Sequence, residues 1–278
     1  MYEPTIVHFA EVSRDKAKAM DRSPLGFFVG AMFAGAYIGM AMILALSAAE
    51  GLPPGVRPLI LGATFGVGLI LTIFAGAELF TGYVMYTGFG LARRGIGWVR
   101  AVQMLVVVWI GNLGGALILA WVFMAGGGGV ALADGGAYLN TYVTHKVEAD
   151  ATALIARAVL CNWLVCLAIW TATRVAGDAA KCIVLGWVLM AFVAAGFEHS
   201  VANMTALSLG LLDPQPAISF VGALRNLLWV TIGNIGGGLV FVVGGYLAAA
   251  RTDTEGPALH DARPLPTSIR PDAIAPAQ

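Results

Sequence analysis

Two short stretches decide the expected fold: AGAELFTG at residues 75–82 and AGFEHSVAN at residues 195–203. Each places glycine and an ionisable side chain inside an apolar segment that is long enough to cross a bilayer. Glycine permits unusual backbone angles, and a charge within a span is costly unless it serves a buried site. Both stretches therefore predict a break in a membrane helix, buried in protein or lining a cavity.

The two stretches belong to an internal repeat. The motif IGNLGG at 110–115 recurs as IGNIGG at 232–237, at nearly the same offset that separates the two break motifs. Each repeat holds three apolar segments, an odd number, so the second copy must enter the membrane from the opposite side. Inverted repeats of this kind are typical of transporters and channels, whose pathway follows the interface between the repeats.

The composition agrees with a membrane protein. Of 278 residues, 59% are apolar and 12% are charged, against about 25% charged in soluble domains, which excludes an ordinary soluble enzyme. Equal numbers of acidic and basic residues argue against a nucleic-acid-binding protein. Six charge-poor stretches predict transmembrane helices, at about 25–49, 58–77, 101–125, 158–173, 183–197 and 226–250. The second and fifth of these spans are expected to continue past their charged residues to about residues 92 and 212.

Three regions of the chain follow from this pattern. Residues 23–250 are expected to form an all-α channel domain, with repeats at about 25–125 and 152–250. Residues 1–22 lack the apolar core of a cleavable signal peptide and predict an amphipathic helix, lying on the membrane surface or in solvent. The proline-rich segment 251–278 is expected to be a disordered tail.

The placement of lysine and arginine predicts the orientation. Ten lie on the side that six spans give to both termini and four on the other side, leaving out the distal tail. The positive-inside rule therefore places both termini in the cytoplasm.

Charged groups inside the spans are the candidates for function. His199 has no counterpart in the first repeat, where Leu79 stands, and an ionisable group within a membrane indicates function by default. Glu78 and Glu198 are candidate proton carriers or, as we favour because the repeat places them identically, caps for the free N–H groups of the half-helices. No pattern predicts a metal or a cofactor, and Cys161, Cys166 and Cys182 form no disulfide framework. Glycine pairs four residues apart predict close helix packing at Gly26/Gly30, Gly35/Gly39, Gly62/Gly66, Gly111/Gly115 and Gly233/Gly237.

At residues 76–82 and 196–204 the chain resembles the formate/nitrite transporter family, and the resemblance extends over about residues 20–250. The family has a nitrite branch and a formate branch, and Tyr83 stands where the nitrite branch is expected to have histidine. The resemblance implies an aquaporin-like protomer of six helices in a bacterial inner membrane, assembled as a homopentamer with one pore in each protomer. Further stretches resemble the nitrite branch more than the formate branch: PLGF at 24–27, VRPL at 56–59, GATFG at 62–66, LCNWLVCLAIW at 160–170 and NLLWVT at 226–231.

The same resemblance implies the layout of a pore. Thr81 is expected beside His199 at the pore centre, between two apolar constrictions. Lys146 and Asn162 match positions that draw or hold the anion, and we add Glu198 and Asn203 to the expected pathway. The constriction residues are expected to be Phe65, Phe80 and Phe192 on the periplasmic side, and Leu69, Leu79 and Val165 on the cytoplasmic side.

These expectations lead to a hypothesis for function. An anion loses too much hydration energy in an apolar constriction, whereas a neutral acid crosses far more easily. Lys146 would concentrate nitrite, and His199 would protonate it or share a proton with it. Formate or hydrosulfide is the alternative substrate in the same fold. A neutral-solute aquaporin-type channel is disfavoured because no Asn-Pro-Ala motif occurs, and an intramembrane enzyme because the adjacent His199 and Ser200 would point apart on a helix.

Overall fold

The computed structural model describes residues 1–251, and all regular elements within that range are helical. The segment 252–278, which holds nearly all of the expected disordered tail, lies outside the described residues. The elements are α1 (Glu3–Arg22), α2 (Pro24–Ala49), α3 (Arg57–Phe65), α4 (Val67–Phe74), α5 (Phe80–Ala92), α6 (Trp98–Ala125), η1 (Gly129–Gly136), α7 (Ala137–Glu148), α8 (Ala151–Arg174), α9 (Asp178–Ala194), α10 (Ser200–Leu212), α11 (Phe220–Gly236), η2 (Gly237–Gly244) and α12 (Gly245–Arg251).

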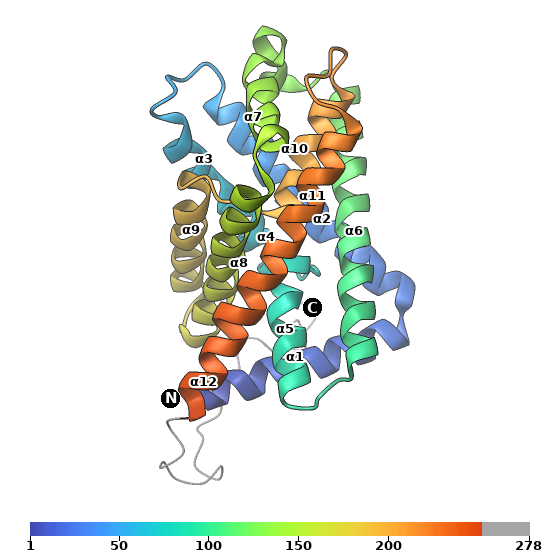
Figure 1. Cartoon of the computed structure of the whole chain (residues 1–278), viewed down its shortest axis with the longest axis vertical. Helices are drawn as coiled ribbons and strands as arrows, with labels where there is room; N and C mark the ends of the chain where they lie inside the picture. Colours follow the sequence, from blue (N-terminus) through green and yellow to red (C-terminus); the bar gives the residue numbers. More distant parts are fainter. Residues whose placement is uncertain (252–278) are drawn as a thin grey trace, which may run out of the picture.

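Five helical stretches within residues 1–251 are long and apolar enough to cross a membrane, and they stand side by side as a bundle (Figure 1). The fifth predicted segment is divided between α9 and α10, of 17 and 13 residues, and α10 is apolar but short. The long stretches are α2, α3 with α4, α6, α8, and α11 continuing through η2 into α12.

The two break motifs interrupt helices as the sequence predicts. Helices α4 and α9 end in the same Schellman geometry, in which an N–H beyond the helix returns to a carbonyl in the last turn. The bonds are Ala77 N–H to the Thr72 carbonyl at 2.9 Å and Phe197 N–H to the Phe192 carbonyl at 3.0 Å. The intervening Gly76 and Gly196 have φ of +76° and +74°, angles that residues with a Cβ rarely adopt.

Glycines bring the long helices into backbone contact. A Cβ on Gly115 of α6 would lie 1.9 Å from the Met32 carbonyl oxygen of α2, and one on Gly237 would lie 2.3 Å from the Val159 carbonyl oxygen of α8. These repeat-related crossings confirm the predicted packing role of the 111/115 and 233/237 pairs.

The pair Gly26/Gly30 does not make a helix crossing of this kind, so that prediction was wrong. A Cβ on Gly26 would meet only Ser23, and Gly30 instead accepts the Glu78 N–H at 3.1 Å. Gly30 thus makes room for the first break, whose chain passes directly against α2.

Helix α1 lies across the lower end of the bundle (Figure 1). Its apolar face inserts Phe9 between the rings of Tyr86, Phe89 and Trp170, at centroid distances of 5.5–6.2 Å. Polar contacts fasten the same helix: Arg93 pairs with Glu3, Arg100 with Asp21 at 2.7 Å, and Arg174 donates to Thr5 at 2.9 Å.

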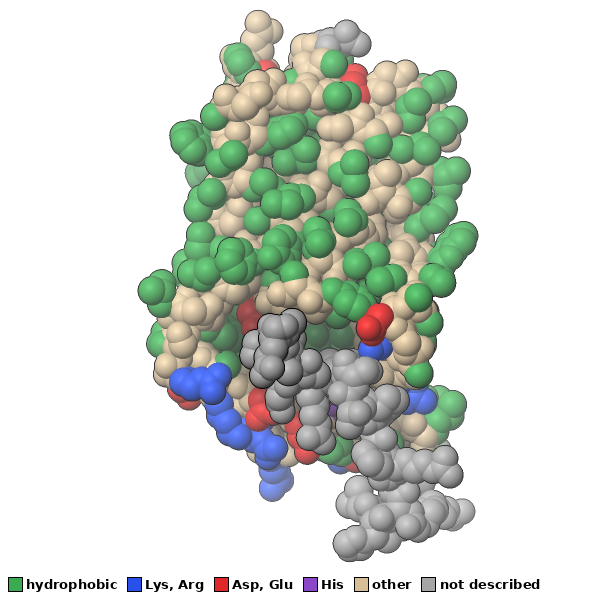
Figure 2. Space-filling model, turned by 180° about the vertical axis from the view of Figure 1, so that it is seen from behind, with side chains coloured by type: hydrophobic (Ala, Val, Ile, Leu, Met, Phe, Trp, Pro, Cys, Tyr) green, Lys and Arg blue, Asp and Glu red, His purple; other side chains and the backbone are tan. Residues whose placement is uncertain are grey.

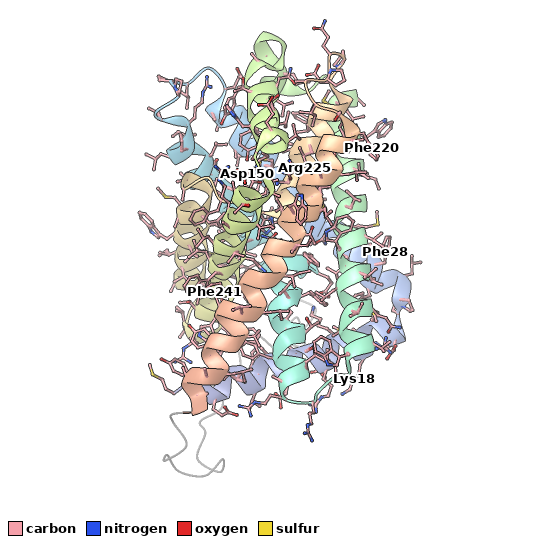
Figure 3. The ribbon with its side chains drawn as sticks, viewed as in Figure 1. Lys18, Phe28, Asp150, Phe220, Arg225 and Phe241 are labelled. Carbon is pink, nitrogen blue, oxygen red and sulfur yellow. The ribbon has the colours of Figure 1, made fainter. Side chains whose placement is uncertain are left out.

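Charged and apolar side chains occupy different parts of the surface along the length of the bundle. Hydrophobic side chains are spread over the upper two thirds of the face in Figure 2, with a few acidic side chains at its top, and most Lys, Arg, Asp and Glu side chains lie at the lower end. Figure 3 labels Lys18 at this charged end, whereas Asp150 and Arg225 lie close together where α7 joins α8. Arg225 donates to the Val147 and Ala149 carbonyls at 3.2 and 2.9 Å, which ties α11 to that joint.

Candidate functional site

The two broken segments bring His199 and Thr81 together. His199 caps α10 and Thr81 lies in the first turn of α5, and their side chains are 3% and 0% exposed. His199 Nε2 lies 3.0 Å from Thr81 Oγ1. A polar pair formed across 118 residues thus joins the two repeats at the place where both helices are interrupted.

The hydrogen-bond network fixes the hydrogen on the His199 ring. The Ala202 N–H donates to His199 Nδ1 at 3.1 Å, so Nδ1 is the acceptor nitrogen. A neutral imidazole carries its single N–H on the other nitrogen, so Nε2–H donates to Thr81 Oγ1. No described contact within residues 1–251 gives the Thr81 hydroxyl hydrogen an acceptor, so this O–H remains available as a donor.

Asparagines cap the two half-helices, and the prediction that glutamates do so was wrong. Asn112 Oδ1 accepts the Phe80 N–H and Asn234 Oδ1 accepts the Ser200 N–H, each at 2.9 Å. The amide groups of both asparagines also donate to the break carbonyls of Glu78 and Glu198 at 2.8 and 2.9 Å, and to the Ala31 and Ala158 carbonyls of α2 and α8 at 2.7 and 2.8 Å. The glutamate side chains are used elsewhere.

Glu198 belongs to a buried network with Lys146. The Lys146 ammonium lies 2.9 Å from Glu198 Oε2, and Asn203 donates to the same oxygen at 2.6 Å. Asn226 accepts from Asn203 at 2.8 Å and donates to the Lys146 carbonyl at 2.8 Å. Burial by itself would lower the pKa of Lys146, but Glu198 and Tyr142 outweigh it and raise that pKa. Lys146 therefore stays charged, with Glu198 as its counter-ion.

Glu78 at the first break has an equivalent lysine partner. Lys16 of α1 binds both Glu78 carboxylate oxygens at 2.6 and 2.7 Å, and the Tyr83 hydroxyl donates to Oε2 at 2.9 Å. At each break, a lysine from a helix outside the repeats thus contacts the glutamate: Lys16 of α1 at the first and Lys146 of α7 at the second. Tyr83, which departs from the expected nitrite-branch pattern, has its hydroxyl in this cluster.

Asn162 of α8 is buried, and its described hydrogen bonds go to neither His199 nor Thr81. Its amide donates to the Asn234 carbonyl at 2.6 Å, and its Oδ1 lies 3.6 Å from the Cys166 thiol. The same thiol lies 3.6 Å from the Thr81 carbonyl. Asn162 therefore connects α8 to α11, whose Asn234 caps the second half-helix, and contacts Cys166, whose thiol reaches the Thr81 carbonyl of α5.

The expected constriction side chains are all buried, with exposed fractions of 1–4%, and share one apolar cluster. Phe65 and Phe192 meet edge to face at 5.9 Å, and Phe192 stacks on His199 at 6.0 Å. Among the contacts of residues 1–251, the Phe80 ring is not paired with these two. Leu69, Leu79 and Val165 belong to the same cluster.

Sequence reasoning missed four residues of this site: Asn112, Asn234, Asn226 and Cys166. The first two stand in the repeated Ile-Gly-Asn motif, which we used as evidence of the repeat and of which only the glycines received a role, in helix packing. Their identical position in both repeats was the signal that could have identified them. Asn226 and Cys166 carry no such signal, because their roles depend on contacts across the fold.

Comparison with known proteins shows the family to which this chain belongs. The pattern of the formate/nitrite transporter family matches residues 7–248. The chain belongs to this family. It is 42% identical over 247 residues to the "Nitrite transporter NirC" of Escherichia coli strain K12, a match that covers 88% of this chain and 91% of that protein.

Two solved structures of family members share the fold. An "FNT family ion channel" superposes with a TM-score of 0.85 at 42% identity, over 88% of this chain and 98% of the other. A "Pentameric formate channel with formate bound" gives 0.71 at 30% identity, over 84% and 98%. These relatives are transporters and channels, which supports a multi-pass membrane protein that is not an enzyme.

Proposed function

We propose that this protein is a nitrite channel of the formate/nitrite transporter family. The observation that carries the proposal is the buried His199–Thr81 pair, formed where two interrupted helices meet under the Phe65–Phe192 contact. The nitrite transporter similar over most of this chain supports nitrite, and the formate-bound structural relative supports formate as the alternative. Hydrosulfide is a further alternative, because it is also a small monovalent anion.

The proposed architecture has six spans in two inverted repeats, bounded as the sequence predicts. Helices α9 and α10 together form the span that neither forms alone. Each repeat then contributes two whole helices and one broken one, with matching Schellman turns and asparagine caps in support. The lysine and arginine distribution places both termini, and therefore α1, on the cytoplasmic side of a bacterial inner membrane. The assembly is a homopentamer in membrane lipid, by analogy with the pentameric relative.

The proposed pathway runs past the apolar constrictions on either side of His199. Phe65, Phe192 and Phe80 form the outer one, and Leu69, Leu79 and Val165 the inner one, as the resemblance implies. Lys146, Glu198 and Asn203 form a polar group on the outer side of the His199–Thr81 pair. Asn162 supports Asn234, the cap of the second half-helix, through its hydrogen bond to the Asn234 carbonyl. No cofactor or metal takes part in this proposal.

The proposed mechanism is that His199 and Thr81 meet the anion as two hydrogen-bond donors. With Nδ1 occupied by the Ala202 N–H, the Nε2 hydrogen is the one that His199 offers. Complete transfer of that hydrogen would leave a strongly basic imidazolate, so His199 shares it unless Nδ1 first gains a proton and releases Ala202. The proton that neutralises nitrite is then taken up from solution together with the anion. Nitrous acid, which is uncharged, crosses the apolar constrictions.

Reconstitution of the full chain in liposomes tests the function. We expect nitrite flux that rises as the pH falls, because the neutral acid becomes more abundant. Formate, chloride and hydrosulfide are compared in the same pH series, with glycerol swelling as the test of a neutral-solute channel. The absence of anion flux at every pH would disprove the proposal.

Variants of the central pair test the mechanism. His199→Ala and His199→Phe remove a donor to a charged ligand, a loss of about 1.5–3 kcal/mol, so we expect nitrite flux to fall at least about tenfold. Thr81→Val removes the hydroxyl at constant shape, and Thr81→Ser is the control that keeps it. Wild-type flux and pH dependence in the histidine variants would show that the pair has no part in permeation.

A further inference from the structure

A column of cations and aromatic rings runs along α7, at the end of the bundle opposite α1 (Figure 1). Tyr138, Tyr142 and Lys146 follow one another at intervals of four and share one helix face. The two tyrosine rings are 6.1 Å apart, and Lys146 Nζ lies 4.8 Å from the Tyr142 ring. Arg57 closes the outer end, with Cζ 4.4 Å from the Tyr138 ring. The column thus leads from Arg57 to the Lys146–Glu198 pair beside His199.

The two cations of the column differ in their availability. Lys146 and Glu198 are 7% and 4% exposed and lie in contact, so their charges cancel at short range. Arg57 is partly exposed, and no carboxylate of the described residues lies within ion-pair distance of it. Arg57, rather than Lys146, is therefore the positive charge of this column that has no carboxylate of residues 1–251 in ion-pair contact.

The surroundings hold the Arg57 guanidinium in one orientation. Its Nε donates to the Leu52 carbonyl at 2.7 Å, and its plane is supported by the Tyr138 ring. Burial raises the pKa of Tyr138 to about 12, with Tyr142 and Glu50 acting in the same direction against Arg57 and Lys146, so the ring is uncharged. Within residues 1–251 the two terminal amino groups of Arg57 have no protein acceptor. They form a planar fork that matches the two oxygens of a small anion.

Arg57 also stands at the head of the buried row that carries the constrictions. Leu61, Phe65 and Leu69 follow it at intervals of four along α3 and α4, and each is at most 7% exposed. Phe65 contacts Phe192, which stacks on His199. The helix that bears Arg57 therefore leads directly to the proposed pore centre.

We propose that Arg57, held by Tyr138 and Leu52, is an outer docking site for planar two-oxygen anions before they pass the constriction. This inference rests on the proposed function and deepens it, because it names the class of anion that the outer end selects. Nitrite and formate present two oxygens to the fork, whereas chloride and hydrosulfide present one atom. Arg57 thus contributes to the discrimination between these two kinds of anion.

Flux measurements in vesicles of known sidedness test this role. At low ionic strength and with nitrite added on the α7 side, Arg57→Gln should raise the KM about two- to fivefold and leave the maximal flux unchanged. Arg57→Lys keeps the charge without the fork, so it should raise the KM for nitrite but not that for chloride. Glu50→Gln removes the carboxylate near Tyr138 and should lower the KM for nitrite.

The outcomes separate the inference from the proposed function. If the wild type carries nitrite and Arg57→Gln keeps its KM at low ionic strength, Arg57 is not a docking site. An equal loss for nitrite added on either side would indicate a structural role and would also overturn the inference. Absence of nitrite flux in the wild type would instead contradict the proposed function.

Discussion

Asn112 and Asn234 each make several hydrogen bonds that keep a broken helix in place. Each side chain accepts the first N–H of a half-helix and donates both to a carbonyl in the break and to one on a neighbouring helix, Ala31 of α2 or Ala158 of α8. Both residues are 0% exposed, so water cannot replace these bonds. An amide is suited to this position because it accepts and donates at once, which a carboxylate cannot do.

The asparagine caps give a prediction for stability. Asn112→Ala and Asn234→Ala each leave buried N–H and carbonyl groups unpaired, at about 1–3 kcal/mol for each group. We expect the thermal unfolding midpoint in detergent to fall by several degrees or the protein to fail to accumulate. Asn140→Ala is the control, because Asn140 is partly exposed and its Oδ1 has no partner within residues 1–251. Equal midpoints for the three variants would contradict the capping role.

At this scale the sequence predicted the ionisable residues better than their partners. His199, Glu78 and Glu198 stood out because charges are rare in apolar segments. The contact of His199 with Thr81 was an expectation from resemblance, and the structure places these atoms 3.0 Å apart. The pairing of Glu78 with Lys16 could not be predicted, because it depends on where α1 docks.

Among the helices, glycine positions separate close crossings from ordinary contacts. Each repeat has two adjacent glycines, Gly114-Gly115 and Gly236-Gly237. A Cβ on the first would make only ordinary contacts, whereas a Cβ on the second would collide with a backbone carbonyl. The sequence does not say which of two adjacent glycines makes the crossing. The four-residue spacing from Gly111 or Gly233 identifies the second one only when the helix face is known. This limit also explains the wrong assignment of Gly26/Gly30, whose spacing is correct but whose face meets the first break.

Matched glycine variants test these crossings. Gly115→Ala and Gly237→Ala place a Cβ 1.9 and 2.3 Å from carbonyl oxygens, so the helices must separate and we expect a large loss of thermal stability. In the neighbours Gly114→Ala and Gly236→Ala, the nearest atoms lie at 3.9 and 3.7 Å, and alanine improves helix propensity by about 1 kcal/mol. Those two variants should match or exceed the wild-type midpoint. The crossings are misassigned if both members of a pair behave alike.

The extent of each helix follows from different physics at its two ends. The predicted extension of the broken segments to about residues 92 and 212 agrees with the ends of α5 and α10, because charged or turn-forming residues follow. The exact break was not predictable from apolar periodicity, since it depends on a positive φ at one glycine and a cap from a distant helix.

Considered as a whole molecule, the single chain leaves both breaks incompletely covered. Ala75 and Gly76 at the first break and Ala195 and Gly196 at the second are exposed on the isolated protomer. Irregular backbone does not face lipid inside a bilayer, because its polar groups would lack partners. In the proposed membrane orientation, other protein must therefore cover these turns, and a second copy of the chain is the simplest cover.

We therefore expect the two breaks to lie at contacts between protomers. Ala75→Lys and Ala195→Lys introduce charge at exposed positions whose backbone tolerates any residue, so the protomer should retain its helix content by circular dichroism. Native mass spectrometry of the wild type should give five times the 28.9 kDa of one chain, and the variants should release smaller species. Ala133→Lys, exposed in η1 outside the candidate spans, is the control that should leave the assembly intact. An assembly that survives both break variants as well as it survives the control would show that the turns are covered by something other than a neighbouring protomer.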